Sequence, residues 1–208
     1  MTPDNAVNHA NRTIALPMPR LDGHCSLEAA LHRRRSVRGF GDEPLALVEM
    51  AQVLWAAQGV VGADGVRTAP SAGALYPLEI YAVLGRVAGL APAVYKYLPE
   101  VHGLRLWAEN DRVHDLAGAA WNQHFMKRAA LIVLFAVVDA RALEKYGERA
   151  IQYVHIEIGH AAQNALLQAT ALGLQAVPVG AFDERQAGAL VQLPRSEGAR
   201  YLLPIGKK

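Results

Sequence analysis

The sequence predicts an α+β fold in which helices flank a central, mainly antiparallel sheet. Three short alternating segments, at residues 79–84, 93–98 and 103–109, follow one another with Gly- and Pro-containing turns between them, as antiparallel strands do. Residues 130–138 are a continuous apolar run of strand length, which indicates a central strand. Residues 149–172 are helical in pattern and apolar on nearly every face, which predicts a helix buried in a large core or a subunit interface.

The remaining elements surround this framework. Residues 1–25 are expected to be an irregular lead-in, because Pro17, Pro19 and Gly23 discourage regular structure. Further helices are predicted at residues 27–35 after an N-cap at Ser26, at 44–59 with Pro44 at the first helical position, at 111–121 and at 183–193. Further strands are predicted at 175–182 and 199–206. We expect residues 1–208 to form a single domain, as the length of the chain suits.

Composition excludes several classes of protein. Hydrophobic residues make up 52% of the chain and charged residues 19%, so a sizeable core is expected. The net charge of +2 argues against a nucleic-acid binder that works by bulk charge. The single cysteine, Cys25, excludes an internal disulfide framework. No signal-peptide or membrane-spanning pattern is present, and we expect a soluble, cytoplasmic protein.

Arginine is concentrated in residues 33–40, RRRSVRGF, which we call the arginine segment. Guanidinium groups match the geometry of phosphate, and a serine hydroxyl adds another donor. If the preceding helix ends near Arg35, then Arg34, Ser36 and Arg38 can point at one anion. The alternative is a solvated basic helix end that only complements the helix dipole.

Two segments consist mainly of residues with small side chains. Residues 67–77, RTAPSAGALYP, form what we call the small-residue loop. Residues 176–183, AVPVGAFD, place Gly180 in an apolar strand pattern. Small residues let a backbone approach something flat or crowded. The alternatives are a tight turn into the next strand and an ordinary bulge.

Metal and dinucleotide sites are not favoured. Glu157 and His160 have the Glu-x-x-His spacing of one half of a di-iron site, but no second such pair occurs. Polar residues that pack inside a buried helix explain them better. The chain also lacks G-x-G-x-x-G and P-loop patterns, so any NAD(P)H would be a transient substrate.

The order of these motifs resembles the FMN-dependent nitroreductase superfamily, and within it the streptolysin-type azoline (thiazoline/oxazoline) dehydrogenases. The resemblance runs from about residue 14 to 206 and rests on RRSVR, APSAGALYPLEIYAV, VYKYLPEVHGL, the long EKYGERAIQYVHIEIGHAAQNALL stretch, VGAFD and LPIG. It implies a nitroreductase-like fold and a homodimer with two FMN sites at the subunit interface. The sequence ends two residues after Gly206, so the C-terminal arm of other members is expected to be missing or short.

The resemblance also implies roles for individual residues. Arg34, Arg35, Ser36 and Arg38 would hold the flavin phosphate and the polar edge of the ring, with Lys207 and Lys208 near the phosphate. Pro70, Ser71, Ala72, Ala74 and Leu75 would lie against the flavin of the other subunit. Gln123, together with Asn122, would bond the pyrimidine side, and Val179, Gly180 and Ala181 would pass the ring.

Three functions follow from the resemblance. In the first, NAD(P)H reduces FMN, which then reduces a nitroaromatic, a quinone or a similar acceptor. In the second, the protein oxidises an azoline in a modified peptide to the azole and oxygen regenerates FMN; that branch uses a Lys-Tyr pair, for which Lys145-Tyr146 and Lys96-Tyr97 are candidates. In the third, the protein binds flavin without turnover.

Overall fold

The computed structural model describes residues 13–121 and 123–208. Its strands form one seven-stranded sheet in the order β1-β4-β3-β2-β5-β7-β6, and every strand pair in these residues is antiparallel. The strands are β1 (Thr13–Ala15), β2 (Leu78–Leu84), β3 (Ala93–Leu98), β4 (Gly103–Glu109), β5 (Leu131–Val137), β6 (Gln175–Ala176) and β7 (Gly198–Gly206). The predicted α+β class is therefore confirmed.

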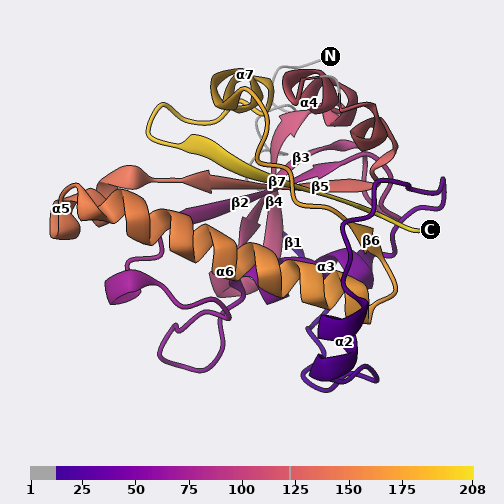
Figure 1. Ribbon diagram of the computed structural model, residues 1–208, viewed down its shortest axis with the longest axis horizontal. Coiled ribbons are helices and arrows are strands. Elements are labelled where there is room, and N and C mark those ends of the chain that lie inside the picture. The colour runs from indigo at the N-terminus through magenta and orange to yellow at the C-terminus, as the bar shows by residue number, and fades with distance from the viewer. Residues whose placement is uncertain (1–12, 122) are drawn as a thin grey trace, which may run out of the picture.

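Helices cover both faces of this sheet (Figure 1). They are α2 (Leu27–Arg33), α3 (Leu47–Gln58), α4 (Val113–Ala119), α5 (Asp139–Tyr146), α6 (Arg149–Ala171) and α7 (Glu184–Leu190), with 3-10 turns η1 (Ala72–Ala74), η2 (Pro99–Val101) and η3 (His124–Arg128). Because side chains alternate along a strand, β5 contributes side chains to two hydrophobic cores, one on each face of the sheet. Leu131, Val133 and Phe135 pack with α3 and α6, whereas Ile132 and Leu134 pack with α4 and α7.

Several boundaries differ from the sequence prediction. The lead-in is not wholly irregular, because Thr13–Ala15 pairs with the start of β4. The helix expected from Pro44 begins only at Leu47, since Leu45 forms a parallel bridge to Val87 and Glu49 accepts a hydrogen bond from the Ala46 N–H. Tertiary pairing overrides local pattern in both places.

Two further predictions were wrong in detail. The strand expected at residues 175–182 is reduced to Gln175–Ala176 and one bridge between Val179 and Leu202, because Pro178 lacks an N–H to continue the ladder. No helix was predicted at residues 139–146, but the structure has the separate helix α5 there, and Lys145 and Tyr146 end it. The sharp reversal at Gly147, whose φ is +54°, divides α5 from α6.

The long helix α6 has 23 residues, about 35 Å at 1.5 Å per residue. One face packs on the core, but the opposite face is open: Ile156 is 47% and Ile151 56% exposed. Gly159, near the middle of the helix, has open space where a side chain would stand. Within one chain the helix is therefore not buried all round. No helix in the described residues is long and apolar enough to cross a membrane.

A charged cluster lies against the β2–β3 pair. The Lys96 ammonium lies 3.1 Å from Glu79 and 3.0 Å from Glu197, and the Tyr81 hydroxyl donates to Glu197 at 2.8 Å. Burial, then the hydrogen bond to Glu197, raises the pKa of the Tyr81 hydroxyl, which stays neutral. Because Glu197 is deeply buried, its carboxylate depends on Lys96 for compensation.

Lys96→Met should therefore lower the free energy of unfolding by about 3 kcal/mol, because it leaves the buried Glu197 carboxylate without its cation. Urea unfolding measures the loss. The matched control is Arg128→Met, which breaks the exposed Arg128–Asp42 pair and should cost less than about 1 kcal/mol. Equal losses in the two variants would contradict a stabilising role for the buried cluster.

Candidate functional site

The arginine segment lies along one end of the sheet. The Val37 N–H donates to Ala176 O at 3.0 Å, and the Gly41 N–H donates to Lys207 O at 2.9 Å. Phe40 packs against the Gly206 backbone so closely that a side chain at Gly206 would lie 3.0 Å from it. These contacts place the segment beside β6 and the last residues of β7, at the α2 end of α6 (Figure 1).

The guanidinium groups of this segment differ in their contacts. Arg35 turns back on the end of α2 and donates to His32 O and Arg34 O, at 2.7 and 2.8 Å. Arg38 lies over the Phe125 ring, 5.9 Å from its centroid. Within the described residues, neither Arg34 nor Arg38 is paired with a carboxylate. Together with the exposed Ser36 hydroxyl, they are suited to an external anion.

A second group of predicted residues lies near this segment. The Gln123 side-chain amide donates to Ala181 O at 2.9 Å, so the structure brings Gln123 and residues 179–181 together. Val179 is buried and doubly bonded to Leu202, whereas Gly180 and Ala181 are exposed. Asn122 lies outside the described residues.

The C-terminal lysines are close to the arginine segment but face different surroundings. The Lys207 ammonium lies 3.7 Å from Glu49 and 3.9 Å from Glu43. Lys208 is exposed. The carboxylates that surround Lys207 compete with any anion for its charge.

The small-residue loop lies at the other end of α6 and has an unusual backbone. Gly73, Ala74 and Tyr76 have φ values of +62°, +53° and +45°, a left-handed conformation that is uncommon for Ala and Tyr. Ser71 supports the turn, because its hydroxyl oxygen accepts a hydrogen bond from the Tyr76 N–H at 2.9 Å. The Gly73 and Ala74 backbone is exposed.

Lys145 and Tyr146 lie directly against this loop. A Cβ atom added to Gly73 would come within 2.5 Å of the Tyr146 hydroxyl and 2.8 Å of the Lys145 ammonium. The loop is thus small at Gly73 because these two side chains occupy the space. The other Lys-Tyr pair is committed elsewhere: Lys96 is ion-paired, and the buried Tyr97 hydroxyl bonds to His102 at 2.8 Å.

Beneath the loop lies a buried carboxyl whose importance the sequence did not reveal. Glu157 of α6 is 2% exposed, and its Oε1 has no hydrogen-bond partner. Burial raises the pKa of Glu157 to about 7, and the Ser71 hydrogen bond and the Arg67 charge oppose this shift only in part. His160 is exposed, so the two residues do not converge as metal ligands. In the described residues no three His, Cys, Asp or Glu side chains gather as a metal site.

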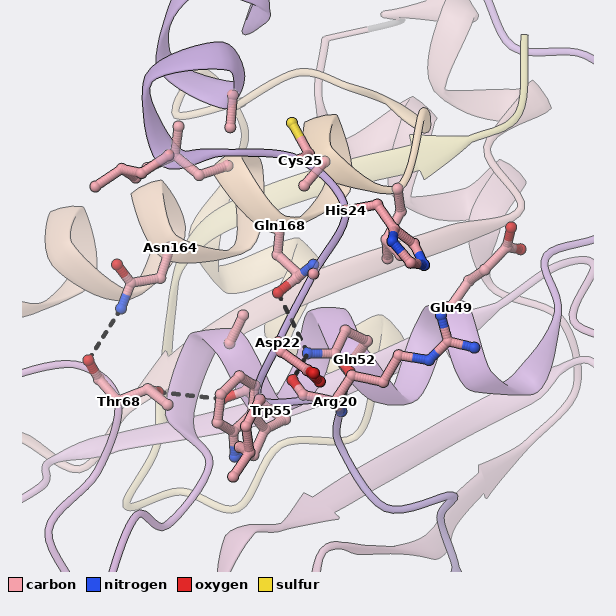
Figure 2. Close-up of a pocket in the computed structure, with 18 of the residues that line it drawn as sticks. Arg20, Asp22, His24, Cys25, Glu49, Gln52, Trp55, Thr68, Asn164 and Gln168 are labelled. Atoms are coloured by element: carbon pink, nitrogen blue, oxygen red, sulfur yellow. Dashed lines mark hydrogen bonds between the residues drawn. The ribbon is translucent and has the colours of Figure 1, made fainter.

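A groove of about 630 Å³ runs between the lead-in, α3 and α6 (Figure 2). The lead-in is tied to α3 by Gln52, which accepts from the Arg20 N–H at 2.8 Å and donates to Arg20 O at 3.0 Å. Gln52 also donates to Gln168 of α6. The Asn164 amide donates to Thr68 O at the start of the small-residue loop. The groove therefore extends along α6 from the loop toward α2.

The sequence profile of the nitroreductase family matches residues 31–207. The chain belongs to the nitroreductase family. The family resemblance predicted from the motifs is thus confirmed, and the chain is classed with oxidoreductases.

Individual relatives agree with this assignment. A Methanocaldococcus jannaschii protein with a provisional nitroreductase name is 40% identical over 196 residues, or 94% of this chain and 98% of that protein. A Ralstonia eutropha structure, also provisionally named a nitroreductase, has a TM-score of 0.83 and 30% identity over 95% of this chain and 90% of its own.

Two more distant structures share the fold. The Escherichia coli microcin synthetase McbBCD complex has a TM-score of 0.73 at 19% identity, covering 100% of this chain and 82% of the matched one. The Vibrio harveyi NADPH:FMN oxidoreductase, complexed with NAD+, has a TM-score of 0.64 at 19% identity, covering 87% and 68%.

Gly73→Ala tests the packing of Lys145 and Tyr146 in this nitroreductase-family protein. Alanine at a positive φ should cost about 1–2 kcal/mol, and the new methyl group should also displace both side chains. Gly89→Ala is the matched control, because Gly89 has a φ of +82° but open space around it. Urea unfolding should give similar losses for both variants, whereas oxidoreductase turnover should fall only in Gly73→Ala. Unchanged turnover in Gly73→Ala would contradict a role for this packing.

Glu157→Gln tests the perturbed carboxyl through stability. The pKa of Glu157 is raised from 4.5 to about 7 in the folded protein. The neutral carboxyl therefore makes its full contribution to stability below about pH 4.5, and this contribution is lost as the pH rises through 7. The Gln variant should gain stability relative to the parent between pH 5 and 8, as measured by urea unfolding at each pH. A constant difference across this range would show that the carboxyl titrates normally.

Proposed function

We propose that this protein is an FMN-dependent oxidoreductase in which NAD(P)H reduces the flavin and a nitroaromatic, quinone or similar acceptor reoxidises it. One arrangement carries the proposal: Arg34 and Arg38, which pair with no carboxylate in the described residues, lie near the exposed Gly180–Ala181 backbone at one end of α6, and the exposed Gly73–Ala74 backbone lies near the other. The name of the Vibrio harveyi fold neighbour, an NADPH:FMN oxidoreductase, supports the choice of cofactor.

The residues present suit FMN chemically. Arg34, Arg38 and Ser36 supply the donors that a phosphate monoester needs. Gly180 and the small-residue loop offer backbone that a flat ring can approach. Gln123 is held at 2.9 Å from Ala181 O, so its amide is positioned beside the same segment. These three features correspond to the phosphate, the face and the edge of a flavin.

The proposed site needs two copies of the chain. The arginine segment lies near the β6 end of α6, a helix about 35 Å long, whereas Gly73 of the small-residue loop lies beside α5 near its start. In a two-fold dimer with antiparallel α6 helices, each arginine segment would meet the partner's loop. The exposed Ile151 and Ile156 and the open Gly159 at the middle of α6 support this packing, because glycine permits close approach of two backbones.

The chain's own groups would then have separate roles. Bound FMN would transfer a hydride between two substrates that use the same cleft in turn. Arg34 and Arg38 would hold its phosphate and favour negative charge nearby. The exposed backbone at Gly180 and Ala181 would orient the ring edge, and the partner's loop would exclude water from its face.

A second candidate function is supported by the position of Lys145 and Tyr146. Oxidation of an azoline ring to an azole removes a proton and a hydride, so it needs a base near the flavin. Tyr146 and Lys145 converge on Gly73 in the loop proposed to contact the ring. FMN would accept the hydride, the Lys-Tyr pair the proton, and oxygen would reoxidise the flavin to give hydrogen peroxide. A flavin-binding protein without turnover is the third possibility.

Arg34→Ala combined with Arg38→Ala should yield protein without flavin, because it removes the unpaired guanidinium groups proposed to bind phosphate. The absorbance near 450 nm of purified protein, after FMN addition and desalting, measures occupancy. The matched control is Arg185→Ala with Arg195→Ala, two exposed arginines outside the arginine segment. Full occupancy in the first double variant would refute the phosphate assignment.

Lys145→Met and Tyr146→Phe distinguish the two enzymatic functions. If NAD(P)H oxidation is physiological, both variants should retain anaerobic bleaching of the flavin by NADH or NADPH within about threefold, since hydride transfer from a nicotinamide needs no base. If azoline oxidation is physiological, oxygen-dependent azole formation should fall at least about 100-fold. Flavin that no nucleotide bleaches, together with no azole formation, would favour the non-catalytic function.

A further inference from the structure

The carboxyl of Glu157 is the most unusual polar group in the described residues. Its side chain is almost fully enclosed between α6 and the small-residue loop, yet Oε1 has no donor. Buried polar atoms are nearly always hydrogen-bonded, so an exception calls for a physical reason. An ionised carboxylate with so few donors is costly to bury.

Glu157 is linked to the loop by a short series of contacts. Its carboxyl lies beside the Ser71 side chain, and the Ser71 hydroxyl accepts from the Tyr76 N–H at 2.9 Å. The Tyr76 hydroxyl accepts from the Arg67 N–H at 3.3 Å, and its ring lies 4.6 Å beneath the Arg67 guanidinium. The contacts therefore span the left-handed stretch from Gly73 to Tyr76.

The surrounding charges do not neutralise the carboxylate. Arg67 is the nearby cation, but its guanidinium donates to Gln58 and Glu100, both at 3.0 Å. The other titratable groups nearby are Tyr76 in the loop, Lys145 and Tyr146 on its outer side, and Tyr153 and His160 one turn away on α6. None of these groups forms an ion pair with Glu157 in the described residues.

We propose that Glu157 is a positioning residue that, in its neutral form, holds the small-residue loop in the conformation that accepts FMN. This inference rests on the proposed function and adds one condition to it, the protonation of Glu157. Ionisation places a poorly solvated negative charge directly under Ser71, so the loop must shift to admit water or counter-charge. The form of the loop that contacts flavin is therefore available only while the carboxyl is protonated.

The test is FMN affinity as a function of pH. Apoprotein is titrated with FMN between pH 5.5 and 8.5, and the quenching of flavin fluorescence gives the dissociation constant for the parent, Glu157→Gln and the exposed control Glu148→Gln. When only one protonation state binds, the apparent dissociation constant scales inversely with its population. With a pKa near 7 for Glu157, the parent should bind about tenfold more weakly than Glu157→Gln at pH 8, and about equally at pH 5.5.

Comparing the three proteins at each pH removes the effect of the FMN phosphate, which also titrates. The FMN phosphate itself titrates near pH 6, but it does so identically for all three proteins, so the ratio of dissociation constants reports the protein alone. Glu148→Gln should follow the parent at every pH. A parent-to-Gln ratio that does not change with pH overturns this inference, while FMN binding by both proteins leaves the proposed function intact. Failure to bind FMN at any pH overturns both.

A second measurement needs no variant and covers the case in which Glu157→Gln does not fold. Because FMN binding requires the protonated carboxyl, binding at pH 8 should take up close to one proton per site. Calorimetry in two buffers with different ionisation enthalpies measures this uptake, and the phosphate is already fully ionised at that pH. Binding at pH 8 without proton uptake overturns the inference.

Discussion

The length of α6 is the constraint on which the rest of the account depends. Its 23 residues extend about 35 Å, with the arginine segment near one end and Gly73 of the small-residue loop near the other. Val37 is bonded to the strand that follows α6, and Gly73 packs on the helix that precedes it. In the proposed dimer each chain would supply two parts of the site, and Gly159 at the middle of the helix would lie near the two-fold axis.

The loop adds a second constraint, because its conformation is costly by itself. Ala74 and Tyr76 occupy left-handed backbone, which is retained only when the surroundings hold it. Here the support comes from α6 through Glu157, from α5 through Tyr146, and from Arg67 within the loop. The proposed link between Glu157 protonation and flavin binding would act through this support of the loop.

Much of this arrangement could be predicted from the sequence. β3 and β4 were predicted to the residue and β2 to within one, because Gly- and Pro-containing turns separate these three short segments. The meeting of Lys145 with Gly73 could not be predicted, since they are far apart in sequence and only the fold brings them together. Glu157 was noticed for its spacing from His160, but a spacing pattern carries no information on burial or on a missing hydrogen-bond partner.

The composite nature of the site is tested most directly by mixing two inactive chains. One chain carries Arg34→Ala and Arg38→Ala, and the other carries Ala74→Trp, which fills the exposed loop surface. Each homodimer should lack flavin, but a mixed dimer has one site with both changes and one site with neither. Co-expressed and doubly tagged mixed dimers should therefore hold about one FMN per dimer. Mixed dimers without FMN would contradict a site shared between chains, as would a purified monomer that binds FMN fully.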